Sequence, residues 1–234
     1  KNKKTFWIND LNKIKEGPCI FLANEFFDAL PINQYLKYKD AWYEKKVNFL
    51  SNGKIEYSNY KVNIKNIEKN VGYKVSKNQK ILEISKTGIK FLKEISKLIN
   101  KKNGGLLIID YGYLEEKMKN TLRGMRNHKI VNILSNYKTC DITYSLSFNF
   151  LSMIAKQLNL HVSGITTQGN FLKSLGILKR AEIISKNLSF SKKADIYFRI
   201  EKLIDKKFMG DIFKVMLLTN SKINFKIGFP TDKI

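Results

Sequence analysis

Two short apolar runs that end in acidic or amide side chains constrain the fold of this chain most strongly. The first run, Cys19 to Ala23, is followed by Asn24 and Glu25, and the second, Leu106 to Ile109, is followed by Asp110. Short apolar runs of this kind are typical of strands buried within a sheet. The sequence therefore predicts two buried strands, each with polar side chains at its carboxyl end.

The segment between these runs predicts the connection. Thr87 to Lys102 carries apolar residues at helical spacing, and Gly104-Gly105 follows as a stop signal. A strand, a helix and a second buried strand indicate the α/β class with a parallel pair. In such sheets ligands bind beyond the carboxyl ends of the strands, which directs attention to the residues after Ala23 and Ile109.

The rest of the chain favours one domain, 1–234, because no proline- or glycine-rich linker and no repeat divides it. A β-rich insertion is expected at 34–80, where Asn52-Gly53 signals the tight turn of a hairpin. Later elements are expected as a helix around Phe148 to Leu158, a strand at Leu160 to Ile165, a helix around Ile196 to Leu203 and a last strand at Ile212 to Leu218.

The net charge of +23 suggests nucleic-acid binding, but the composition argues against it. Only four of the 43 basic residues are arginine, the better reader of phosphates and bases, and the lysines are spread with asparagine and isoleucine along the chain. An AT-biased coding sequence gives the same excess without selection for binding. A nucleic-acid binder remains an alternative that a salt-dependent binding assay would test.

Other classes of protein receive little support from the sequence. Cys19 and Cys140 have no metal-ligand spacing, so we expect no metal site and a reducing compartment. No apolar run approaches the roughly 18 to 20 residues of a membrane helix, and we expect no membrane partner.

The polar residues at the strand ends have two interpretations. They are either functional groups of a site or local caps and turn residues. Asn24 and Asp28 are common cap types, and an aspartate such as Asp110 often organises a turn. Spacing alone leaves both interpretations open.

Several ordered blocks resemble one family. The stretch from Ala23 to Ile32, with the letters ANEFFDALPI, is similar to the signature of the mitochondrial dysfunction protein A family of S-adenosylmethionine-dependent methyltransferases. Further blocks resemble the family in the same order: Gly104-Gly105 with Ile108 to Tyr113, Thr121 to Gly124 with His128, Asp141 to Thr143, Thr167 to Gly169 with Phe171-Leu172 and Leu175 to Ile177, and Met209-Gly210 with Phe213 to Val215.

The resemblance implies a class I, Rossmann-like methyltransferase fold with a β-hairpin insertion and helical carboxyl-terminal elements. It implies S-adenosylmethionine as cofactor and methylation of a protein arginine in a respiratory complex I subunit during assembly. It also implies a bacterial cytoplasmic location, or the mitochondrial matrix in a eukaryote. A homodimer is a further expectation.

The resemblance also assigns candidate site residues. Asn24, Glu25 and Asp28 are expected to be catalytic, because carboxylates pair with a guanidinium through two parallel hydrogen bonds. Substrate-binding residues are expected to be Phe26, Phe27, Asp110, Tyr111, Tyr113, Arg123 and His128. Core packing is the alternative for the two phenylalanines, and a surface position is the alternative for Arg123.

One part of the family pattern is missing. The strand and glycine-rich turn of the form ELGPGxG, which holds the cofactor, does not occur, so no cofactor-binding residue is identified. The chain resembles the carboxyl-terminal two-thirds of such an enzyme, and we expect a fragment that is inactive and binds S-adenosylmethionine weakly by itself. The alternative is a non-catalytic remnant or partner-binding module of the same fold.

Overall fold

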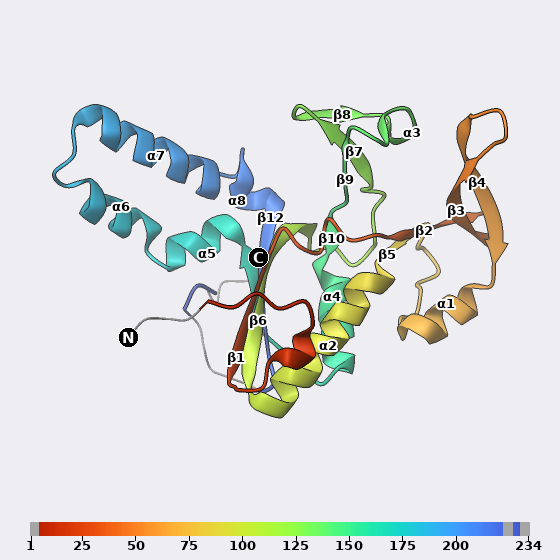
Figure 1. Ribbon diagram of the computed structural model, residues 1–234, viewed down its shortest axis with the longest axis horizontal. Coiled ribbons are helices and arrows are strands. Elements are labelled where there is room, and N and C mark those ends of the chain that lie inside the picture. Colours follow the sequence, from red (N-terminus) through yellow and green to blue (C-terminus); the bar gives the residue numbers. More distant parts are fainter. Residues whose placement is uncertain (1–4, 222–226, 230–234) are drawn as a thin grey trace.

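The computed structural model describes residues 5–221 and 227–229, so the two ends of the predicted domain 1–234 lie outside the described residues. The described chain forms three sheets with helices around them (Figure 1). The strands are β1 Cys19–Asn24, β2 Asn33–Tyr38, β3 Ala41–Phe49, β4 Ile55–Val62, β5 Ile81–Ile84, β6 Gly104–Tyr113, β7 Arg123–Arg126, β8 Lys129–Val131, β9 Asp141–Thr143, β10 Leu146–Ser147, β11 His161–Thr167 and β12 Phe213–Thr219.

The central sheet has the strand order β1-β6-β12-β11, and the short β10 also pairs with β6. β1 runs parallel to β6, with Cys19 opposite Gly104 and Asn24 opposite Ile109. β12 runs antiparallel to both β6 and β11. The predicted parallel pair is therefore present within a mixed sheet, and the carboxyl end of β1 lies beside Ile109, four residues before the end of β6.

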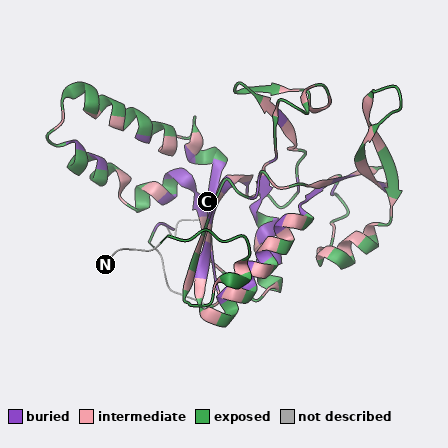
Figure 2. Cartoon of the chain, in the orientation of Figure 1, coloured by how far each residue is buried: buried purple, intermediate pink, exposed green. Residues whose placement is uncertain are grey.

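Two amphipathic helices pack beside this sheet, α2 Lys86–Lys102 and α4 Phe148–Gln157. Each begins at a serine whose hydroxyl accepts a hydrogen bond from a backbone N–H of the first turn, which is the usual N-cap arrangement. Leu92 and Ile99 of α2 are fully buried, together with Leu106 and Ile108 of β6. Figure 2 shows this buried material running along the sheet and the inner faces of the helices.

The second sheet has the order β4-β3-β2-β5 and contains the predicted hairpin. β3 and β4 pair from Trp42–Val62 to Phe49–Ile55, and Gly53 takes a left-handed conformation in the loop that joins them. A short helix, α1 Ile64–Val71, follows β4. Trp42, Tyr35 and Leu82 belong to the same core cluster as the central sheet, so the two sheets share one core. The boundaries of an insertion at 34–80 remain a prediction.

The third sheet has the order β8-β7-β9 and is followed along the chain by the short β10. Its β7–β8 hairpin turns at Asn127 and His128, which both have left-handed backbone angles. A short helix, α3 Ile133–Asn136, lies between β8 and β9.

The expected helical elements near the carboxyl terminus form an arm that projects from the central sheet (Figure 1). They are α5 Gln168–Ser174, α6 Ile177–Ser185, α7 Phe190–Ile204 and α8 Met209–Ile212. Within the described residues, no helix is both long enough and apolar enough to cross a membrane.

Two details of the predicted strands are wrong. β6 does not end at Ile109 but continues to Tyr113, because Asp110 and Tyr111 still pair with β12. The first strand is not buried on both faces, because Ile20 and Leu22 are 87% and 68% exposed. β1 is an edge strand in the described chain, and no described element covers the face that carries Ile20 and Leu22.

Candidate functional site

The candidate site begins where β1 ends. Glu25 follows the strand directly, and its backbone N–H donates to the carbonyl of Ile109 at 3.0 Å, which fixes it beside β6. Its φ of +47° lies in the left-handed region, which is uncommon for a residue other than glycine. Both Glu25 and Asn24 are exposed, and the Asn24 amide donates to Glu25 Oε1 at 3.4 Å. The chain therefore turns sharply here and presents two polar side chains to solvent.

Asp110 holds the turn that follows. Its Oδ2 accepts hydrogen bonds from the backbone N–H groups of Phe27, at 3.0 Å, and Asp28, at 3.3 Å. Its Oδ1 accepts a third from the N–H of Tyr111, and the side chain is fully buried. The enclosed carboxylate positions the Phe26–Asp28 segment, and the contact of Asp110 with substrate stays a prediction.

The environment of Asp110 changes its ionisation. Burial, together with the nearby carboxylate of Asp28, raises the pKa of Asp110 to about 7, against the lowering effect of the three backbone N–H donors. A buried carboxylate pair next to a strand end is a common feature of functional sites.

Asp28 is 7% exposed and lies between two elements. The hydroxyl of Thr143, in β9, donates to Asp28 Oδ2 at 2.8 Å, which joins the third sheet to the turn after β1. Thr143 pairs with Arg123 across the sheet, so these two residues share a face. Asp28 is thus both a structural anchor and a wall of the adjacent pocket.

Tyr111 and Arg123 contact each other near the turn after β1. The Arg123 guanidinium lies 5.8 Å from the centre of the Tyr111 ring, and its buried Nε has no hydrogen-bond partner in the described structure. Burial raises the pKa of Tyr111, and the charges of Glu25 and Asp28 raise it further. Glu25, Asp28 and Arg123 therefore lie close enough for their charges to act on the Tyr111 hydroxyl.

The two phenylalanines of the signature, Phe26 and Phe27, differ in their exposure to solvent. Phe27 is 1% exposed and belongs to the core, which favours the packing alternative, and its contact with substrate stays a prediction. Phe26 is 36% exposed, and its ring makes edge contacts with Phe27 and with Phe91 of α2. Phe26 alone of the pair presents an aromatic face near Glu25.

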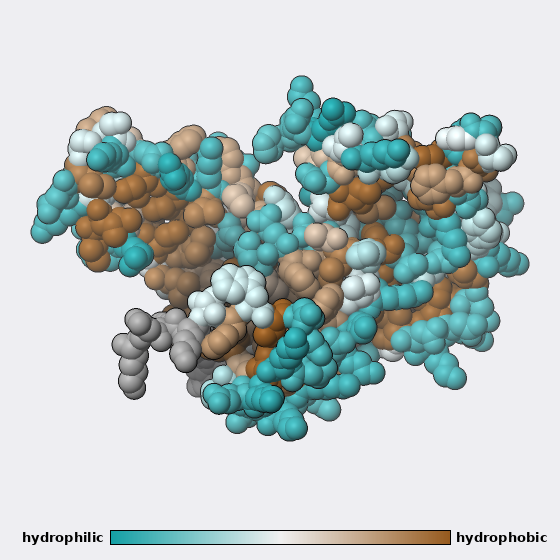
Figure 3. Space-filling view, viewed as in Figure 1, coloured by the Kyte–Doolittle hydropathy of each residue, from teal (hydrophilic) through white to brown (hydrophobic). Residues whose placement is uncertain are grey.

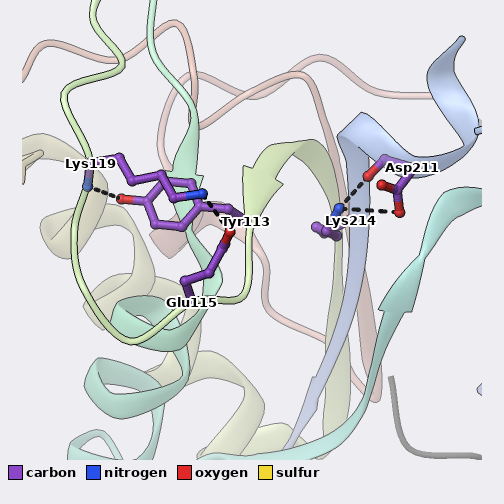
Figure 4. A network of polar contacts seen from close by, with 5 residues as sticks. All are labelled: Tyr113, Glu115, Lys119, Asp211 and Lys214. Carbon is purple, nitrogen blue, oxygen red and sulfur yellow. Dashed lines mark hydrogen bonds and ion pairs between the residues drawn. The ribbon is translucent and has the colours of Figure 1, made fainter. Parts of the chain in front are cut away.

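Tyr113 and His128 lie away from the turn. The Tyr113 hydroxyl accepts a hydrogen bond from the backbone N–H of Lys119 at 3.0 Å, which closes the loop after β6 (Figure 4). Burial raises the pKa of Tyr113 to about 12. The hydrogen bond with Lys119 gives Tyr113 a structural role, and its contact with substrate stays a prediction. His128 is exposed at the tip of the β7–β8 hairpin, five residues beyond Arg123 along the chain.

Sequence reasoning missed Glu83, a buried carboxylate of β5. It accepts hydrogen bonds from the Gln34 amide at 2.7 Å, from the N–H groups of Thr121 and Leu122 at 3.0 Å, and from the Thr121 hydroxyl. It thereby attaches the segment that leads into Arg123 to the second sheet. The alternation of β5, in which Glu83 stands between Leu82 and Ile84, gave no signal that the carboxylate is enclosed.

Residues 1–166 match the family described as "Putative S-adenosyl-L-methionine-dependent methyltransferase". This match covers most of the chain. The chain belongs to this family. The turn after β1, the β1–β6 junction and the third sheet all lie within the matched region.

Curated relatives in animals match the chain over most of its length. The mitochondrial protein arginine methyltransferase NDUFAF7 of Xenopus tropicalis is 29% identical over 188 residues, which are 76% of this chain and 41% of the relative. The same protein of Danio rerio is 26% identical over 218 residues, 92% of this chain and 51% of the relative. The chain thus spans about two-fifths to one-half of the length of these relatives.

A solved structure confirms the fold. A protein of Burkholderia thailandensis, crystallised with S-adenosyl-homocysteine, superimposes with a TM-score of 0.75 over 95% of this chain and 58% of its own, at 20% sequence identity. The Rossmann-like methyltransferase fold expected from the sequence is therefore correct.

The described residues do not form a complete cofactor cradle. Gly164, Gly169 and Gly210 do not open a space for a ligand, because the Phe229 ring or the backbone around Ile204 occupies the position where a Cβ would stand. Asn24 and Glu25, exposed at the edge of the sheet, are the polar groups available beside the end of β1. The glycines present therefore do not fit the pocket for the cofactor, and Asn24 and Glu25 remain candidates for the target side of a methyl-transfer site.

Proposed function

We propose that this chain supplies the target-binding part of an S-adenosylmethionine-dependent protein arginine N-methyltransferase. The observation that supports this proposal most directly is the position of Glu25. It is an exposed carboxylate in a left-handed conformation at the junction of β1 and β6. The names of the animal relatives and the family match support the reaction class. The motif resemblance supports a respiratory complex I subunit as the substrate.

The proposed chemistry needs a planar cation to be held while one of its nitrogens is alkylated. S-adenosylmethionine, when bound, supplies an electrophilic methyl group. Glu25 accepts two N–H groups of the target guanidinium and fixes its plane, and the Asn24 amide oxygen accepts a third. Transfer would form an N–CH₃ bond as the S–CH₃ bond breaks, with S-adenosylhomocysteine as the leaving group, and the proton lost from the nitrogen would pass to Glu25, the exposed carboxylate at this place.

Three neighbouring groups support this arrangement. Phe26 covers one side of the guanidinium with an aromatic face, which lowers the local dielectric and strengthens the pairing with Glu25. Arg123 lies 5.8 Å from the centre of the Tyr111 ring and supports that side chain beside the site. Asp28 is held by Thr143 and sets the path of the chain after Glu25. Most of the rate gain is expected from positioning.

The function is tested by product analysis. The complete gene product that carries residues 1–234 is incubated with methyl-labelled S-adenosylmethionine and purified complex I subunits, and the products are hydrolysed to amino acids. We expect the label in methylarginine, and no label when the modified arginine is replaced by lysine. Label in lysine or in base-labile methyl esters would show a different reaction.

The second candidate, a non-catalytic partner-binding module, is favoured by the incomplete cradle among the described residues. It predicts that the complete gene product binds a complex I subunit and transfers no label in the same assay. The homodimer, the cellular location and the identity of the complex I subunit remain proposals at this level.

A further inference from the structure

A pocket of about 380 Å³ lies next to the turn after β1, with Asp28 in its wall. Its lining comes from three parts of the fold: the segment after Glu25, the β3–β4 hairpin and the third sheet with its helix. The aliphatic residues are Ala29, Leu30, Pro31, Ile32, Val47, Leu122, Ile133 and Ile142. Figure 3 shows apolar side chains gathered between the hydrophilic tips of the two hairpins.

The volume suits a side chain rather than a solvent molecule. Pockets that bind small molecules begin at about 300 Å³ and are lined mostly by apolar groups with a few polar ones. Here the Gln34 amide already donates to Glu83 at 2.7 Å and to Asn120 at 3.0 Å. The pocket therefore offers a mostly apolar surface, because the Gln34 amide already donates its hydrogen bonds to Glu83 and Asn120.

Lys45 is the polar group of the pocket that lacks an anionic partner. Its ammonium lies 3.8 Å from the centre of the Tyr57 ring, and no ion pair or hydrogen bond of the described residues includes it. Burial lowers the pKa of Lys45, and the charge of Glu83 partly opposes this shift. Lys45 is half-buried and forms no direct ion pair with a carboxylate of the described residues. Its ammonium therefore favours an anionic group on the molecule that fills the pocket.

We propose that this pocket binds the segment of the protein substrate that flanks the target arginine. One large apolar side chain of that segment fills the space beside Val47 and Ile142, and a neighbouring carboxylate pairs with Lys45. The inference rests on the proposed function, because Asp28 belongs both to the pocket wall and to the turn that presents Glu25. The net charge of +23 also favours approach of an acidic segment.

The test uses short synthetic peptides with a central arginine and otherwise glycine. Leucine is moved position by position, with glutamate beside it, and the reference peptides carry alanine and glutamine instead. Affinity for the complete gene product is measured by fluorescence anisotropy, and methylation is measured separately. We expect one leucine position to tighten binding about tenfold or more, the usual gain from filling an apolar pocket.

Two matched pairs of variants locate the effect. Val47→Trp fills the pocket and should abolish the leucine preference, whereas Ile130→Trp, at an exposed β-branched residue of β8, should keep it. Lys45→Glu should change the preferred neighbour from glutamate to lysine. Lys46→Glu, at the next residue, which already pairs with Glu44 at 3.2 Å, should not.

The outcomes separate this inference from the proposed function. Peptides that bind with the leucine and glutamate preference but are never methylated would contradict the function and support the pocket. Methylation without any positional preference, or a preference that Val47→Trp retains, would overturn the pocket. A Val47→Trp variant that weakens S-adenosylmethionine binding and leaves peptide affinity unchanged would also overturn it.

Discussion

At the scale of single residues, the carboxylates of the signature region divide into exposed and enclosed groups. Glu25 faces solvent in a left-handed conformation, whereas Asp110 is fully buried and accepts three backbone N–H groups. The sequence indicated that both strand ends carry acidic residues. It did not indicate which of them is enclosed, because that depends on contacts between residues more than 80 positions apart.

The raised pKa of Asp110 predicts a pH dependence of stability. Its folded pKa of about 7 lies above the ordinary value of an aspartate, so its contribution to stability is fully present below about pH 4 and is lost as the pH rises through 7. Asp110→Asn remains neutral and should lack this loss. Relative to wild type, its free energy of unfolding should improve by roughly 2 to 4 kcal/mol between pH 4 and 7.5.

Urea unfolding across this pH range measures the difference between the two proteins. Asp40→Asn, at an exposed aspartate in the β2–β3 turn, serves as the control and should follow the wild-type curve. If the curves of Asp110→Asn and wild type run parallel from pH 4 to 7.5, the ionisation of Asp110 is not altered by folding.

At the scale of elements, local patterns predicted most of the strands and helices correctly. The helix at 87–102, the hairpin turn at Asn52-Gly53 and the helix that starts near Phe148 all follow from periodicity and turn chemistry. The extension of β6 through Tyr113 and the exposed face of β1 were not predicted, because both depend on which strands lie alongside. Pairing between distant segments leaves no periodic signal in either segment.

The attachment of the third sheet through Glu83 predicts a stability effect. Glu83→Gln replaces one carboxylate oxygen by an amide donor and leaves an N–H or hydroxyl of the Thr121–Leu122 segment without an acceptor. The free energy of unfolding should fall by about 1 to 3 kcal/mol. Glu56→Gln, which removes an exposed pair with Lys54, should change it by less than about 0.5 kcal/mol. Equal stability of Glu83→Gln and wild type would refute the anchoring role.

At the scale of the whole molecule, three sheets meet around the turn after β1 and one core joins the first two of them. The β1–β6 junction supplies Glu25, and the third sheet supplies Arg123 and Thr143. This convergence brings residues from motifs between 23 and 143 together beside the turn after β1. The candidate site could be foreseen from the sequence only through the resemblance, since spacing alone left caps and catalytic groups indistinguishable.

The central claim is that Glu25 orients the guanidinium at the end of β1. The most direct test compares turnover of Glu25→Gln with that of wild type in the complete gene product, with the arginine substrate and S-adenosylmethionine both saturating. Glu25 is exposed and makes one long side-chain contact, so the melting temperature should change little. We predict a fall in kcat of about 100-fold or more, as when other preorganised electrostatic groups are removed. A Glu25→Gln enzyme that turns over at the wild-type rate would contradict the assignment.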